Sequence, residues 1–97
     1  MLRKIIFALC VFALPLAAQA QAFVNKNLKV ALILPGSVTD GTFNSAAAQG
    51  IKKAQAKYPG LHVSIRENTQ TAEAQDALSA YARDGYDIII AHGFQFA

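Results

Sequence analysis

The feature that most constrains the fold is an apolar run, Val30-Ala31-Leu32-Ile33-Leu34, that precedes a Pro-Gly turn. Every position in it is apolar, whereas a strand with one solvated face alternates apolar and polar residues. Such a run predicts a strand buried on both faces, which is typical of a parallel sheet covered by helices. In open sheets of this kind, ligands bind beyond the carboxyl ends of the strands. The segment 35–44 is therefore the first place to expect a ligand site.

The rest of the chain repeats the order strand, helix, strand. Periodicity predicts strands at 28–34, 61–66 and 86–91, and helices at 43–57 and 71–84. The second strand alternates apolar and polar residues, which places it near a sheet edge, whereas Ile88-Ile89-Ile90 in the third strand is typical of a central strand. The predicted fold is α/β, a βαβαβ unit with a parallel sheet, right-handed crossovers and strand order 2-1-3.

Both predicted helices carry one apolar face. In the first helix Thr42 is the expected N-cap, and the expected inward residues are Ala47, Gly50, Ile51, Ala54 and Tyr58. In the second helix the expected inward residues are Ala74, Ala77, Leu78 and Tyr81, with Gly85 just past the end of the helix.

Residues 1–20 have the three parts of a cleavable secretory signal: Arg3-Lys4, an apolar span, and the small-residue site Ala18-Gln19-Ala20. The span contains Pro15 and is shorter than the ~20 residues that a membrane-spanning helix needs. Cys10, the one cysteine, lies too early to be the lipid-modified residue of a lipoprotein. We therefore expect a periplasmic or secreted protein without a cysteine-linked lipid anchor.

Removal of the signal changes the charge and the length. The net charge falls from +3 to +1, because Arg3 and Lys4 are lost, and no basic patch remains to favour nucleic acid as a partner. The 77 residues that remain of 97 are few for an α/β domain without disulfides. We expect a short lead-in at 21–27 and, at 28–97, part of the first lobe of a longer protein.

The three predicted strands deliver their carboxyl ends to one sheet edge. The segments 35–42, 67–70 and 92–97 meet there, next to the start of the first helix. Together they present polar and aromatic side chains: Asp40, Phe43, Asn44, Glu67, Asn68, His92, Phe94 and Gln95. Aromatic faces next to hydrogen-bonding groups suit a small, flat, polar ligand, because a base stacks on an aromatic ring and a carboxylate binds hydroxyls strongly.

Motifs for catalysis or for a metal site are missing from the sequence. There is no nucleophile elbow, no Walker-type phosphate loop and no GxGxxG after the first strand. His62 and His92 have no companion at metal-ligand spacing. The sequence predicts a binding protein with no catalytic residues, metal or cofactor. The alternative is an enzyme on a doubly wound α/β domain, for which Asp40 with His92 is the one conceivable acid/base pair.

Two motifs carry a family resemblance. The first motif is Asp40-Gly41-Thr42-Phe43-Asn44, and the second is Gly85-Tyr86-Asp87 followed by His92-Gly93-Phe94. The stretch from about Leu28 to Ala97 resembles the basic membrane protein family, the PnrA-like substrate-binding proteins of ABC transporters. The resemblance implies a type I periplasmic-binding-protein fold of two α/β lobes joined by a hinge. It also implies a purine nucleoside, purine base or similar ligand between the lobes and an ABC permease in the inner membrane as partner.

The resemblance also implies site residues. By position, Phe43 stacks on the base, Asp40 and Asn44 belong to the same motif, and Gly93-Phe94 forms a turn beside the ligand. Weaker candidates are Gly36, Asn68 and His92. Several nucleoside-binding members carry Thr-Asp where this chain has Ile33-Leu34, so a free base or another small ligand stays an alternative, as does a sugar-binding, amino-acid-binding or sensor relative.

These candidates also have purely structural interpretations. Phe43 fits an ordinary core position at the start of a helix, and Asp40 fits a carboxylate that stabilises the positive helix N-terminus. His92 fits a hydrogen-bonded histidine at a strand end, and Glu67 and Asn68 fit an exposed turn.

Overall fold

A computed structural model describes residues 27–97. The elements are β1 (Lys29–Ile33), α3 (Phe43–Lys57), β2 (His62–Arg66), α4 (Thr71–Arg83), β3 (Ile88–Ala91) and a short 3-10 helix, η1 (Phe94–Phe96). The three strands and two helices lie where periodicity predicts them, and their ends differ from prediction by at most two residues. The predicted signal, and the lead-in up to residue 26, lie outside the described residues.

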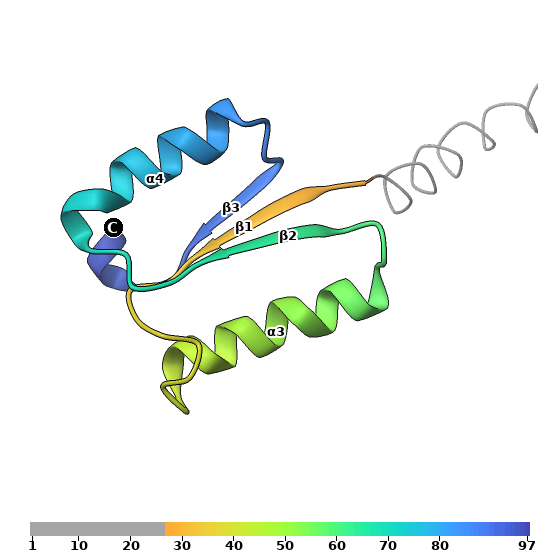
Figure 1. Cartoon of the computed structure of the whole chain (residues 1–97), viewed down its shortest axis with the longest axis horizontal. Coiled ribbons are helices and arrows are strands. Elements are labelled where there is room, and N and C mark those ends of the chain that lie inside the picture. Colours follow the sequence, from red (N-terminus) through yellow and green to blue (C-terminus); the bar gives the residue numbers. More distant parts are fainter. Residues whose placement is uncertain (1–26) are drawn as a thin grey trace, which may run out of the picture.

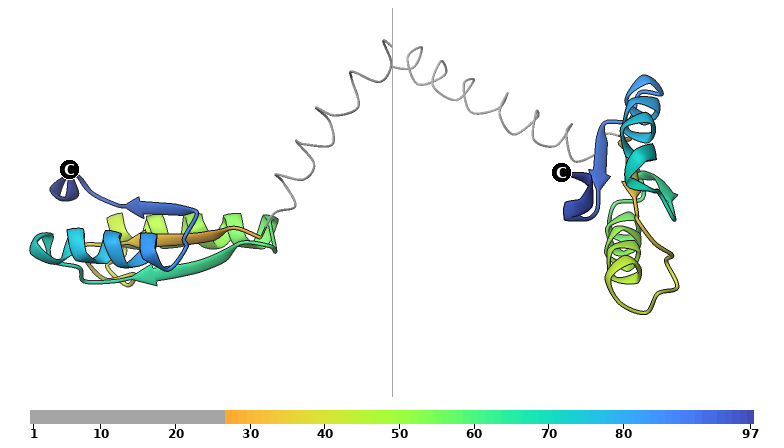
Figure 2. Two further views of the ribbon diagram at one scale, coloured as in Figure 1. Left: turned by 90° about the horizontal axis from the view of Figure 1, so that it is seen from above. Right: turned by 90° about the vertical axis from the view of Figure 1, so that its left-hand side faces the viewer.

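The strands form one parallel sheet in the order β2-β1-β3, as predicted. The two helices cover opposite faces of it, α3 on one side and α4 on the other (Figures 1 and 2). All three strands point toward the same end of the molecule, on the left in Figure 1. Within residues 27–97, no helix has the length and apolar character needed to cross a bilayer.

The core is centred on β1. Val30 to Ile33 and the following Leu34 are at most 2% exposed, which confirms that this run is buried on both faces. Each fully buried Val, Leu or Ile stabilises the fold by about 1.5–3 kcal/mol. The helices contribute small residues, Ala48 from α3 and Ala74 and Ala77 from α4. Alanine side chains let the helices lie close to the sheet, α4 against β1 and β3 and α3 against β2. The loop after β1 therefore leaves from a rigid base.

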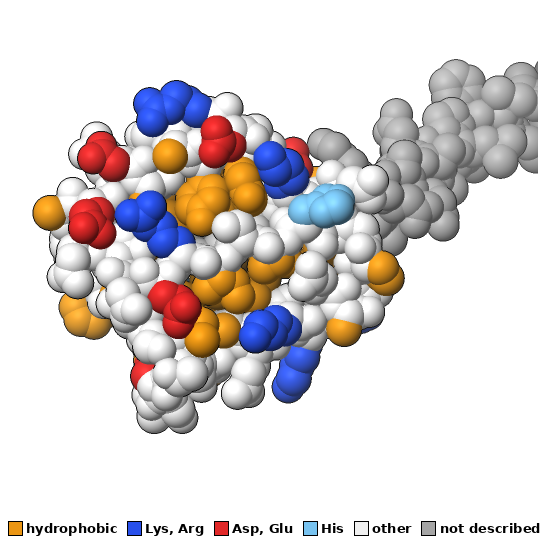
Figure 3. Space-filling model, viewed as in Figure 1, with side chains coloured by type: hydrophobic (Ala, Val, Ile, Leu, Met, Phe, Trp, Pro, Cys, Tyr) orange, Lys and Arg blue, Asp and Glu red, His pale blue; other side chains and the backbone are white. Residues whose placement is uncertain are grey.

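The outer strands are less buried than β1. Val63 and Ile65 of β2 are half-buried, and the face that carries β2 shows hydrophobic side chains gathered near its centre with charged side chains around them (Figure 3). Ile88 and Ile90 of β3 are 44% and 39% exposed. Within the described residues β3 pairs with β1 alone, so this central-type sequence occupies an edge position.

The strand register explains why these isoleucines are exposed. The Ser64 hydroxyl lies 3.0 Å from the Tyr81 hydroxyl of α4, and Ser64 is in register with Ile89 across β1. Ile89 therefore faces α4, and its neighbours Ile88 and Ile90 face the opposite side, because strand side chains alternate between faces. That is the side of α3, which packs against β2 rather than β3.

The buried face of α3 differs from the prediction. Gly50 is exposed and Tyr58 is 43% exposed, so their predicted inward positions are wrong. The buried residues are Asn44 and Ala48, with Ala47, Ile51 and Ala54 half-buried. The contact stripe thus begins at a polar residue, which the apolar pattern did not include. Tyr58 is the C-cap residue, just past the last turn of α3.

The inward face of α4 was predicted well. Ala74 and Ala77 are buried, and Leu78 and Tyr81 are half-buried. Gly85 has φ +78° directly after the C-cap residue Asp84, a left-handed conformation that glycine adopts without steric cost.

Candidate functional site

The loops that follow the strands meet at the carboxyl edge of the sheet, as predicted. The sheet hydrogen bonding continues one residue past the strands, because Leu34 N–H donates to the Arg66 carbonyl at 2.8 Å and His92 N–H donates to the Ile33 carbonyl at 2.9 Å. The segments 35–42, 67–70 and 92–97 all start from this edge (Figure 1). Their side chains form the candidate site.

Asp40 organises the first of these loops. Its Oδ1 accepts hydrogen bonds from the backbone N–H groups of Thr42 and Ser45, and its Oδ2 accepts from the backbone N–H and side-chain Nδ2 of Asn44, all at 2.8–2.9 Å. The Thr42, Ser45 and Asn44 backbone donors hold the pKa of this carboxyl well below its usual range. Four bonds fill the roughly four acceptor positions of a carboxylate.

The side-chain cap of α3 is therefore supplied by Asp40. Thr42 occupies the N-cap position, as predicted, but its own side chain makes no capping hydrogen bond. Asp40 lies two residues earlier and reaches the same N–H groups because positive φ at Gly41 turns the chain back toward the helix. The structural interpretation of Asp40 holds, and its direct contact with a ligand stays a prediction.

Asn44 is buried next to this cap, with 8% of its surface exposed. Its Nδ2 donates to Asp40, while its buried Oδ1 has no hydrogen-bond partner within residues 27–97. Gly36 makes room for this side chain, because a Cβ at Gly36 would lie 2.5 Å from Asn44 Nδ2. Gly36 thus serves the site by being small. Asn44 is the one candidate with an unused buried acceptor.

Glu67 joins the second loop to the first. Its Oε1 accepts a hydrogen bond from Val38 N–H at 2.7 Å and lies 3.4 Å from the Ser37 hydroxyl. Asn68, with φ +52°, donates its backbone N–H to the Gly36 carbonyl at 3.1 Å. The sequence placed both residues at this edge but gave no role to Glu67. The sequence signal for this role is the position of Glu67, a carboxylate directly after an edge strand and next to a loop whose N–H groups need acceptors.

Phe43 and His92 bring the first and third loops together. Their ring centroids are 4.0 Å apart with an interplanar angle of 24°, which is a stacked arrangement. His92 Nε2 also lies 3.2 Å from the Phe43 carbonyl oxygen. Phe43 is 50% exposed, so the interpretation of Phe43 as an ordinary core residue is wrong. An aromatic platform therefore stands at the edge where the strands end.

This geometry can now be compared with known proteins. A family model for PnrA-like ABC transporter substrate-binding proteins matches residues 27–97. The chain belongs to this family. A solved structure of an ABC transporter system solute-binding protein from Conexibacter woesei is 31% identical in sequence and similar in fold, with a TM-score of 0.66. The similarity covers 71% of this chain and 23% of that protein. No curated protein sequence matches significantly.

Family membership confirms the predicted resemblance, and the similar structure confirms the α/β fold. This PnrA-like chain spans less than a quarter of the length of the Conexibacter protein. The fold described above therefore corresponds to one part of such a solute-binding protein.

The Gly93-Phe94 turn of this PnrA-like chain lies at the end of β3. Gly93 has φ +132°, and a Cβ there would overlap the side chain of Gln95, so glycine is required. The Gly93 carbonyl accepts a hydrogen bond from Phe96 N–H at 3.1 Å, which forms η1. Phe94 is 93% exposed. Its ring extends into solvent from the same edge as Phe43, and its contact with a ligand stays a prediction.

Ile33 and Leu34 are fully buried, at 0% exposure. Where several nucleoside-binding members carry Thr-Asp, this PnrA-like chain thus places two core side chains. Neither can reach a ligand, so any polar contact at this edge must come from other residues.

The groups of the conceivable acid/base pair have other partners. The Asp40 carboxylate is engaged by the start of α3, and His92 Nε2 by the Phe43 carbonyl. Within residues 27–97, no three His, Cys, Asp or Glu side chains gather closely enough to hold a metal ion.

Proposed function

We propose that this chain forms one wall of a solute-binding site that captures a purine nucleoside, a purine base or a similar small ligand for an ABC permease in the inner membrane. The observation that carries the proposal is the half-exposed Phe43 ring at the carboxyl edge of a parallel sheet. Stacking of a base on such a ring contributes about 1–3 kcal/mol. Family membership supports the transport role.

The loop around Phe43 suits this task because it is held in place before a ligand arrives. Asp40 fixes the first turn of α3, and Glu67 ties the loop to its neighbour. A preformed platform avoids the cost of ordering side chains on binding. The next residue in the chain, Asn44, is buried, and its Oδ1 has no hydrogen-bond partner within residues 27–97.

The rest of the proposed cycle follows from the two-lobe architecture of binding proteins. A second lobe closes over the ligand by a hinge, and the closed form is presented to the permease. The predicted signal at residues 1–20 supports a periplasmic or extracellular location for this step. Because this chain has Ile33-Leu34 where several nucleoside-binding members carry Thr-Asp, a free base is as good a candidate ligand as a nucleoside.

Calorimetric titration of the complete gene product tests the ligand class. Adenosine, guanosine and inosine, and then adenine, guanine and hypoxanthine, are titrated separately at neutral pH. Saturable binding of at least one of them is expected. A protein that binds none of the six, while unfolding cooperatively on heating, would contradict the purine proposal.

Replacement of Phe43 by alanine tests the platform. Phe43→Ala should weaken binding of the same compound by about tenfold or more, because the stacked ring is lost. The matched control is Tyr58→Ala, which removes another exposed aromatic ring just past the opposite end of α3. Equal affinity of Phe43→Ala and wild type would show that Phe43 is not the platform.

A further inference from the structure

A second aromatic ring, that of His92, lies against the proposed platform. The two rings stack with centroids 4.0 Å apart, and they come from the start of α3 and the end of β3, 49 residues apart in the chain. His92 is itself anchored, because its backbone N–H donates to the Ile33 carbonyl at 2.9 Å. Its backbone is therefore anchored to the most buried strand of the sheet.

The contact between the two residues also fixes the protonation pattern of His92. The Phe43 carbonyl oxygen can only accept a hydrogen bond, so the neutral imidazole must carry its proton on Nε2. Nδ1 is then an acceptor, and within residues 27–97 it has no hydrogen-bond partner. The ring is thus oriented by one nitrogen and by stacking, and its other nitrogen is free.

These contacts restrict Phe43 in two ways. The hydrogen bond holds the backbone of the first residue of α3, and the imidazole covers one face of its ring. Half of the Phe43 surface is nevertheless exposed, which leaves the ring accessible beside the covered face. A flat ligand therefore meets a ring that is already oriented and supported from behind.

We propose that His92 is the positioning residue for Phe43, and that a planar ligand completes a three-layer stack on the free face of the Phe43 ring. This inference rests on the proposed function, because it assigns a supporting residue to the same platform. His92 acts through Phe43, mainly through ring stacking. The hydrogen bond of 3.2 Å between partly exposed groups adds orientation and contributes less to affinity.

Three substitutions at His92 separate the ring from the hydrogen bond. In titrations with adenosine, guanosine and inosine, His92→Ala should weaken binding about two- to tenfold, the range expected for loss of an aromatic pair. His92→Phe keeps a stacking ring and should restore most of that affinity. His92→Gln keeps a donor without a ring and should resemble His92→Ala. Wild-type affinity in His92→Ala, or restoration by Gln and not by Phe, would overturn the proposal.

Nuclear magnetic resonance of the wild-type complete gene product gives an independent test that no folding defect can confuse. Without ligand, we expect nuclear Overhauser effects between the Phe43 and His92 rings and imidazole nitrogen shifts of the Nε2–H form. Both signals should persist when the ligand saturates the site. Their absence without ligand, or loss of the ring contact on saturation, would overturn the role of His92. Failure of every purine to bind would instead remove the proposed function while leaving the ring contact measurable.

Discussion

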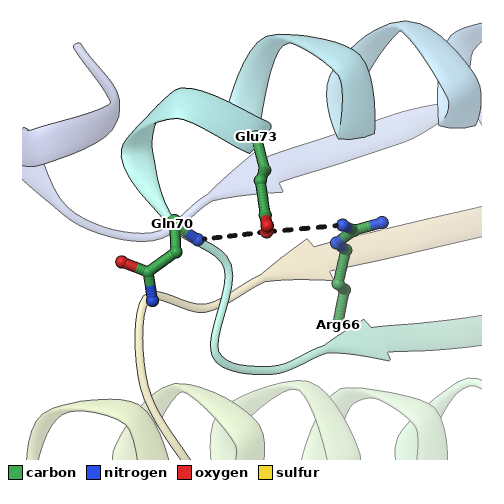
Figure 4. A network of polar contacts seen from close by, with 3 residues as sticks. All are labelled: Arg66, Gln70 and Glu73. Atoms are coloured by element: carbon green, nitrogen blue, oxygen red, sulfur yellow. Dashed lines mark hydrogen bonds and ion pairs between the residues drawn. The ribbon is translucent and has the colours of Figure 1, made fainter.

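The two loops that lead from a strand into a helix are built very differently. In the first, one carboxylate, Asp40, accepts four hydrogen bonds at 2.8–2.9 Å from the start of α3. In the second, Glu73 of α4 accepts one longer bond, 3.4 Å from Gln70 N–H, and lies 3.8 Å from the Arg66 guanidinium (Figure 4). The side chains of that ion pair are 45% and 55% exposed. Exposed pairs of this kind contribute little to stability.

The two loops differ in how many side-chain contacts hold them in place. Both loops connect a parallel strand to a helix and need only one cap each. The first loop has in addition a buried amide at Asn44, a glycine at position 36 that admits it, and a tether from Glu67. The second loop supplies that tether and is joined to the first by backbone hydrogen bonds, from Asn68 N–H to the Gly36 carbonyl and from Thr69 N–H to the Leu34 carbonyl, but the carboxylate at its helix start makes only one long bond. The tightly held loop is the one that delivers Phe43, which is what a preformed binding wall requires.

The largest expected effect comes from filling the space beside Asn44. Gly36→Ala places a Cβ 2.5 Å from Asn44 Nδ2, so the amide must move and its bond to Asp40 must lengthen or break. Overpacking of this type costs about 1–3 kcal/mol in the free energy of unfolding. Urea denaturation of the complete gene product measures it, and purine affinity should fall as well because Phe43 neighbours Asn44.

Gly50→Ala is the matched control for that substitution. Gly50 lies inside α3, is exposed, and has open space around an added Cβ. Alanine should raise stability there by about 0.5–1 kcal/mol, because glycine loses more conformational freedom in a helix. A loss of stability at Gly50 equal to that at Gly36 would mean that the tight packing around Asn44 is not special.

Asp40→Asn should have the next largest effect. An amide has one oxygen and no charge, so it cannot accept all four bonds, and the variant should unfold at a lower urea concentration at neutral pH. The pKa of Asp40 is lowered in the folded protein, so its stabilising effect is complete above the unfolded pKa of about 3.9. The effect is lost as the pH falls from there toward the folded value.

The pH profile gives this prediction its sharpest form. The difference in stability between wild type and Asp40→Asn should stay constant from pH 7 down to about pH 5 and should shrink below about pH 4. Urea denaturation at a series of pH values measures the difference directly. A difference that already shrinks between pH 7 and pH 5 would contradict the lowered pKa.

Much of the fold could be predicted because its determinants are local. The uninterrupted apolar run of β1 and the helical spacing of Ala74 and Ala77 show in the sequence itself, and the rules for parallel sheets then give the strand order. The edge that carries the site follows from the same rules. Asp40, Phe43 and Asn44 were singled out from one contiguous motif.

The details that could not be predicted depend on contacts between distant segments. Whether Thr42 or Asp40 caps α3 is decided by the positive-φ turn at Gly41, which glycine permits but does not by itself impose. From the sequence His92 is only a weaker candidate, because a hydrogen-bonded histidine is common at a strand end. Its partner, Phe43, lies 49 residues away, and only the folded sheet brings the two together. The tether from Glu67 to Val38 is of the same kind. Periodicity describes which face of an element is apolar, and it does not describe which polar groups meet.

The smallest expected effect is at the second loop, and it decides whether the two loops really differ. Glu73→Gln should lower the free energy of unfolding by at most about 0.5 kcal/mol, because the Arg66 pair is exposed and the Gln70 bond is long. Most of that effect should disappear in 1 M salt, where exposed charges more than about 3 Å apart are screened.

The matched variant is Glu67→Gln, which alters the neighbouring carboxylate that accepts Val38 N–H at 2.7 Å. A glutamine oxygen still accepts this bond but without the charge that strengthens it, so stability should fall more than in Glu73→Gln. Of these two carboxylates, only Glu67 contacts the loop that leads to Phe43, so purine affinity should fall in Glu67→Gln and not in Glu73→Gln. Equal losses of stability and affinity in the two variants would show that both loops are held alike. The hydrogen bonds of the first loop would then not be related to ligand binding.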